Sequence, residues 1–131
     1  MPVQADVSAG GDNEAVVNHV VEEAIKEFGR IDVLINNAQA SASGVTLADH
    51  TTEQFDLSIY SGLYAVFYYM KACYPHLKET KGTVINFASG AGLFGDTEKE
   101  IGRVCIQLAS PDFKYMSGET LTVEGGMGLR P

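Results

Sequence analysis

The most informative stretch of the sequence is Arg30-Ile31-Asp32-Val33-Leu34-Ile35-Asn36-Asn37-Ala38-Gln39. Its run 31–35 is short, mostly apolar and rich in β-branched residues, which predicts a buried strand of a parallel sheet rather than a helix. Ligands of such sheets bind just beyond the carboxyl ends of the strands. The residues that end the stretch, 36–39, are therefore the expected site for a small molecule. The alternative is a polar strand exit that binds no ligand.

The residues before this strand predict an amphipathic helix that ends at Phe28. Asp12 or Asn13 can cap its N-terminus, and Gly29 suits the position just after its C-terminus. The helix is amphipathic because its apolar and charged residues fall on opposite faces. The apolar face carries Val17, Val20, Val21, Ala24 and Phe28.

A second helical region follows, and it is strongly apolar and aromatic from Phe55 to about Leu77. Thr51 or Thr52 is expected to open it, with a capping glutamine or glutamate in the first turn. Residues 61–62, a serine and a glycine, are expected to divide it into two helices. A helix with so wide an apolar surface needs more than one partner. It either covers the sheet or contacts a second subunit, and the number of tyrosines favours the second subunit.

The whole chain predicts an α/β fold, namely a reduced three-layer domain over residues 1–131 with a mostly parallel sheet of about four strands. The segments that join these strands are long enough for right-handed parallel connections. A last helix, opened by a capping box at 97–100, is expected to bury Cys105 and to stop near Pro111. The four expected strands are 3–5, 31–35, 83–87 and 120–123.

Composition excludes some functions. The 131 residues carry a net charge of −8, which argues against binding to nucleic acid and to anionic membrane surfaces. No apolar run reaches transmembrane length, and the first residues do not resemble a signal peptide. Cys73 and Cys105 lack metal-ligand spacing and are expected to be buried thiols. A cytoplasmic location is the default expectation.

Four motifs in the correct order resemble the short-chain dehydrogenase/reductase family. They are Ala5-Asp6-Val7-Ser8, the strand ending in Asn36-Asn37-Ala38, the segment Val84 to Gly92, and the tail Gly118 to Gly126. The resemblance implies a Rossmann-like fold and an NAD or NADP cofactor. It also implies hydride transfer to or from a small carbonyl or alcohol substrate. In this family the long helix, here 60–78, pairs subunits, which implies a homo-oligomer.

The resemblance also assigns candidate site residues. Ser89 matches the catalytic serine, which hydrogen-bonds the substrate oxygen. Asp6 and Val7 match residues that contact the adenine, and 37–39, which are Asn37, Ala38 and Gln39, match the cofactor loop. The alternative for Asp6 is a turn or a helix cap, which its short acceptor side chain suits.

The proton machinery departs from the family. A tyrosine should follow Ser89, with a lysine one helical turn later that lowers the tyrosine pKa toward working pH. After Ser89 the sequence contains only Tyr115, and Glu119 stands at the lysine position. The family's relay asparagine is also missing from the long helix, where Tyr60 and Gly62 occupy its neighbourhood.

The cofactor machinery departs as well. The family begins with a strand and a glycine-rich turn that holds the pyrophosphate, and this sequence starts after that unit. Gln39 replaces a glycine, which puts a side chain where backbone should approach the cofactor. A deletion between about 96 and 97, a gene relic or a truncated gene model would each explain the pattern.

The expected function is therefore that of an oxidoreductase by ancestry that is inactive alone. One alternative is a non-catalytic α/β module that associates through 60–78. The other is a nucleotide-binding remnant that uses 36–38 or the motif Gly90-Ala91-Gly92-Leu93-Phe94-Gly95, which follows a strand and precedes a helix.

Overall fold

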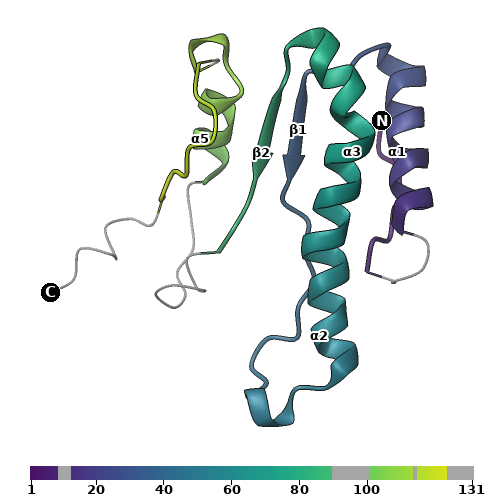
Figure 1. Cartoon of the computed structure of the whole chain (residues 1–131), viewed down its shortest axis with the longest axis vertical. Coiled ribbons are helices and arrows are strands. Elements are labelled where there is room, and N and C mark those ends of the chain that lie inside the picture. The colour runs from purple at the N-terminus through teal and green to yellow at the C-terminus, as the bar shows by residue number, and fades with distance from the viewer. Residues whose placement is uncertain (9–12, 90–100, 114, 124–131) are drawn as a thin grey trace, which may run out of the picture. The chain divides into compact units, whose positions relative to one another are not determined.

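The computed structural model describes residues 1–8, 13–89, 101–113 and 115–123 (Figure 1). The chain forms two compact units, Met1–Asn86 and Phe87–Pro131. The single domain expected over 1–131 stays a prediction. No helix in the described part of the chain is long and apolar enough to cross a membrane.

The first unit is an α/β structure, which confirms the predicted fold class. Its two strands are separated by a helical crossover, as expected for parallel pairing. Figure 1 shows α1 and α3 side by side, with both strands next to α3. In chain order the elements are α1 (Asn13–Phe28), β1 (Val33–Asn36), a 3₁₀ turn η1 (Leu47–Asp49), α2 (Thr52–Ile59), a π-helical turn η2 (Tyr60–Tyr64), α3 (Ala65–Thr80) and β2 (Thr83–Asn86).

β1 and β2 pair in parallel and end together. The register runs from Val33 beside Thr83 to Asn36 beside Asn86. The predicted strands 31–35 and 83–87 are thus confirmed, with boundaries shifted by one or two residues. The carboxyl ends of the two strands consequently form one shared edge.

The prediction of strands at 3–5 and 120–123 is wrong, because neither segment pairs with a strand in the described residues. Both segments are short, and a short extended segment is held as a strand only by neighbours that bond its backbone. In the resembled sheet such neighbours lie between or beside these strands. The described sheet has two strands rather than four. The third layer stays a prediction.

Local capping signals were predicted correctly. Gly29 has φ of +72°, and its N–H donates to the Ile25 carbonyl at 2.8 Å, so it terminates α1 as expected. Thr51 caps α2 through a reciprocal pair of bonds with Gln54, whose N–H donates to Thr51 Oγ1 at 3.3 Å. In return, the Thr51 N–H donates to Gln54 Oε1 at 3.0 Å. Both ends depend only on neighbouring residues.

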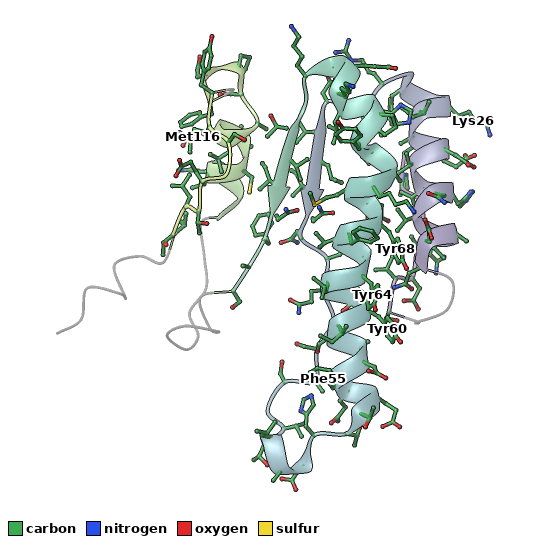
Figure 2. The ribbon with its side chains drawn as sticks, in the orientation of Figure 1. Lys26, Phe55, Tyr60, Tyr64, Tyr68 and Met116 are labelled. Carbon is green, nitrogen blue, oxygen red and sulfur yellow. The ribbon has the colours of Figure 1, made fainter. Side chains whose placement is uncertain are left out.

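The expected break at Ser61 and Gly62 is replaced by one π-helical turn, and the helix continues through it. The Ala65 N–H bonds the Tyr60 carbonyl across this turn. Figure 2 shows Tyr60, Tyr64 and Tyr68 following one another along the helix; neighbouring ring centroids lie 5.4 Å and 6.1 Å apart. Such tilted ring pairs are favourable, so they support the continuous helix across the turn.

The core of the first unit lies between α1 and α3. Val17 and Val21 of α1 meet Cys73 and Leu77 of α3, and Val17 is fully buried. Leu34 of β1 packs against this cluster together with Val7, Ile31, Tyr68, Tyr69 and Ala72. One sheet strand and two helices therefore share a single small core.

The turn between α3 and β2 is tied to the start of β1. Thr80 Oγ1 donates to the Ile31 carbonyl at 2.8 Å, and the Thr83 N–H donates to the Asp32 carbonyl at 2.9 Å. The Gly82 N–H returns to the Leu77 carbonyl at 2.8 Å. These bonds fix the level at which the second strand enters the sheet.

The second unit contains α5 (Ile101–Leu108) and a 3₁₀ turn η3 (Pro111–Phe113), which confirms the expected last helix. Cys105 is buried, as is Cys73, and both are free thiols. Burial raises the pKa of the Cys73 thiol, which fits an inert core residue. The capping box at 97–100 and the glycine motif at 90–95 lie outside the described residues.

Candidate functional site

Two asparagines mark the shared carboxyl edge of the sheet. Asn36 Nδ2 donates to Asn86 Oδ1 at 2.7 Å, and Asn36 is 9% exposed. The parallel register places these side chains at the same level, so each strand end orients the other. A buried carboxamide held in this way offers a fixed polar group at the edge where parallel sheets bind ligands.

A cavity of about 280 Å³ opens beside this edge. It reaches from the N-terminal segment to the start of α3, and its walls are mostly apolar. Three predicted cofactor contacts, Val7, Asn37 and Ala38, are among its lining residues. Burial, with a smaller contribution from Cys73, raises the pKa of Tyr69, so this phenol stays protonated at the cavity wall. The lining consists of Val7, Leu34, Ile35, Asn36, Asn37, Ala38, Ala65, Val66 and Tyr69.

Asp6 does not line this cavity. Its Oδ1 accepts hydrogen bonds from the Ser8 hydroxyl at 2.5 Å and the Ser8 N–H at 2.9 Å. These two bonds, the hydroxyl first, lower the pKa of Asp6. Asp6 thus forms a turn, which is the alternative to the adenine contact. The adenine contact itself stays a prediction.

Gln39 leans on the long helix rather than into the cavity. A Cβ on Gly62 would lie 3.1 Å from Gln39 Nε2, so the side chain rests against the bare glycine backbone. The next residue, Ala40, donates its N–H to Ser61 Oγ at 2.9 Å. The sequence suggested Ser61 and Gly62 only as a helix break. The contact spans 21 positions of the chain, so no local pattern could reveal it.

Ser89 belongs to the second unit, so its relation to the cavity and its catalytic role stay predictions. Tyr115, the tyrosine nearest to a family position, is 93% exposed in the same unit. Within the described ranges, no group of three or more histidine, cysteine, aspartate or glutamate side chains is arranged to hold a metal.

A wider hollow of about 450 Å³ lies between Ser8 and α2. Glu53 and Asp56 are among its lining residues, together with Gln54, Leu57 and Tyr60. Two carboxylates repel the phosphates of a dinucleotide. The smaller cavity at the strand ends is therefore the better candidate for a nucleotide.

Residues 1–100 match the family model described as short chain dehydrogenase. The chain belongs to the short-chain dehydrogenase family. The chain is 45% identical to a 12alpha-hydroxysteroid dehydrogenase of Clostridium sp. (strain ATCC 29733 / VPI C48-50), in a match that covers all of this chain and 77% of the relative. It is also 39% identical, over 98 residues, to the peroxisomal hydratase-dehydrogenase-epimerase of Neurospora crassa, a match that covers 68% of this chain and 11% of that protein.

Among solved structures, ElxO with NADP bound matches this chain with a TM-score of 0.60 and 33% identity. That match covers 72% of this chain but only 37% of ElxO. The match to the Clostridium enzyme extends over 199 positions, whereas this chain has 131 residues. The alignment therefore has about 68 more positions than this chain has residues. Because the match covers all of this chain, these extra positions fall between its aligned residues and not beyond its ends.

Proposed function

We propose that this chain binds part of NAD or NADP at the carboxyl ends of β1 and β2 but does not transfer hydride by itself. The observation that carries the proposal is the cavity beside Asn36, whose lining includes three of the predicted cofactor contacts. NADP bound to ElxO supports the choice of ligand.

The size and chemistry of the cavity suit a nucleoside-sized portion of the cofactor. Ligand pockets commonly measure about 300–1,000 Å³, so about 280 Å³ is at the low end and too small for a whole dinucleotide. Val7 and Ala38 supply apolar walls, while Asn37 and Tyr69 are lining residues that carry polar groups. When bound, the nicotinamide would supply the hydride donor or acceptor.

The missing function is proton transfer. A general acid or base contributes about 10²–10⁴-fold to such reactions. Glu119 at the lysine position carries a negative charge, so it cannot supply the cation that stabilises a tyrosinate. The roughly 68 unmatched positions support an internal deletion that removed the tyrosine–lysine segment. Ser89 alone could orient a substrate oxygen but would leave its proton without a carrier.

Calorimetric titration with NADPH tests the binding site. The wild-type chain is expected to saturate, and Ala38→Leu is expected to bind at least about tenfold more weakly, because the larger side chain fills the cavity. Ala48→Leu is the matched control, since Ala48 is exposed on η1 away from the cavity. Equal affinities in wild type and Ala38→Leu would place the site elsewhere. A wild-type chain without binding would leave only an association module.

The same protein, incubated with NADP and a 12α-hydroxysteroid, tests the second half of the proposal. The substrate is chosen because the Clostridium relative is a 12alpha-hydroxysteroid dehydrogenase. No NADPH absorbance is expected above the rate without protein. Sustained turnover by the purified chain would refute the claim that it lacks proton machinery.

The long helix supports a second proposal, association with another copy of this chain. Leu63, Phe67, Met70 and Tyr74 recur at intervals of four, three and four residues, so they share one side of the helix. Their exposed fractions lie between 41% and 65%. The core residues Cys73 and Leu77 face α1 instead. A continuous apolar stripe of this kind is typical of an interaction surface.

Phe67→Glu is expected to reduce the sedimenting mass at tens of micromolar protein, because a buried carboxylate without a partner opposes the contact. Glu79→Lys is the control, since Glu79 is exposed on the same helix but lies five residues after Tyr74, away from the side that carries the stripe. A wild-type chain that sediments strictly as a monomer would contradict the proposal. The cytoplasmic location expected from the sequence stays a prediction.

A further inference from the structure

We infer that Ser61 is the positioning residue of the loop after β1, and that it sets nucleotide affinity by holding Ala40. The inference rests on the proposed nucleotide site at Asn36–Ala38. Ser61 would hold the loop from a long helix in which the family's asparagine is missing.

The hydroxyl of Ser61 bridges the helix and the loop. Its Oγ accepts the Ala40 N–H at 2.9 Å and lies 3.0 Å from the Ala40 carbonyl and 2.7 Å from the Leu57 carbonyl. The hydroxyl has one proton to donate, so it serves one carbonyl at a time while its lone pairs remain available to Ala40. The loop is therefore held at the Ala40 N–H in either arrangement.

Burial makes this contact strong. Ser61 is only 3% exposed, so water cannot easily replace the hydroxyl. Ala40 is partly buried, so removal of the hydroxyl would take away this hydrogen bond and loosen the loop at that residue. The residue also lies in the π-helical turn Tyr60–Tyr64, and single π turns in long helices are frequent at functional sites.

Gly62 holds the adjacent loop residue. The side chain of Gln39 rests against Gly62, where a Cβ would come within 3.1 Å of Nε2. Ser61 and Gly62 thus fix Ala40 and Gln39, which directly follow the cavity residue Ala38. This arrangement directs Gln39 onto the helix, although the residue replaces a family glycine beside the cofactor.

The test compares Ser61→Ala with Ser58→Ala. Ser58 is the matched control, because its hydroxyl donates to the Gln54 carbonyl of its own helix, at 3.4 Å. Amide hydrogen exchange is measured on the nucleotide-free chain, and NADPH affinity is measured by calorimetry. Ser61→Ala should speed exchange at Ala40 and weaken NADPH binding about tenfold, which corresponds to about 1.4 kcal/mol. Ser58→Ala should change neither.

Gly62→Ala provides a second variant should Ser61→Ala fail to fold. It presses on Gln39 but keeps the hydroxyl, so affinity should fall while Ala40 stays protected. Unchanged exchange at Ala40 in Ser61→Ala would overturn the inference. Faster exchange with unchanged affinity would also overturn it, because Ser61 would then be merely structural. A wild type that binds no NADPH would refute the proposed function and the effect on affinity, while exchange at Ala40 would still decide whether Ser61 holds the loop.

Discussion

Gly82→Ala is expected to lower the free energy of unfolding by about 3 kcal/mol, the upper range for an overpacked site. A Cβ at this position would lie 2.5 Å from the Asp32 carbonyl oxygen, 2.6 Å from Leu77 Cδ2 and 2.9 Å from Thr80 Oγ1. The first of these atoms belongs to backbone that also receives the Thr83 N–H, so it cannot move without breaking that bond. Urea unfolding measures the change.

Gly44→Ala is the control, because it makes the same glycine-to-alanine change at a site with open space. Gly44 has φ of +78°, but no atom outside its neighbours lies within 4 Å of the added Cβ. The expected cost is about 1 kcal/mol, from backbone strain alone. An equal loss of unfolding free energy at Gly44 and Gly82 would mean that the turn before β2 adjusts to the added Cβ. That result would contradict the tight packing around Gly82.

Leu77→Ala is expected to cost a further large amount, about 3 kcal/mol, because it removes a side chain from the centre of the core. Leu77 is 7% exposed and packs in the cluster with Val17, Val21 and Cys73. Leu47→Ala makes the same chemical change at a residue that is 93% exposed, so its cost should stay within about 0.5 kcal/mol. Protein concentration must be equal throughout, since association would add apparent stability.

The two substitutions should also interact. Leu77→Ala removes the Cδ2 atom that an alanine at position 82 would meet at 2.6 Å, while the contact with the Asp32 carbonyl remains. The double variant should therefore be less destabilised than the sum of the singles, by about 1 kcal/mol. Strict additivity would show that the two side chains do not share this space.

The sequence predicted the elements whose signals are local. The helix at 13–28 and the cap at Thr51 depend on periodicity and on residues three or four apart. The strands at 31–35 and 83–87 were predictable because each is a short, mostly apolar run rich in β-branched residues. The strands expected at 3–5 and 120–123 failed, because a strand depends on a neighbour that no local pattern reports.

The candidate site was predictable to the same extent. The sequence placed a ligand beyond residue 36, and the cavity found there is lined by Val7, Asn37 and Ala38. The sequence could not predict the hydrogen bond between Ala40 and Ser61 or the contact of Gln39 with Gly62. Both contacts join the loop to the helix across many intervening residues. Such contacts are set by tertiary packing, which also decided that Ser61 lies in a π turn.

The core cluster and both strands of the sheet lie before residue 87. Changes in the later part of the gene therefore replace none of the residues that form that core. Such changes can remove residues that the reaction needs while every residue of the core is kept. A lineage that no longer needed the chemistry could in this way keep the first half of an enzyme as a stable inheritance, available for another use.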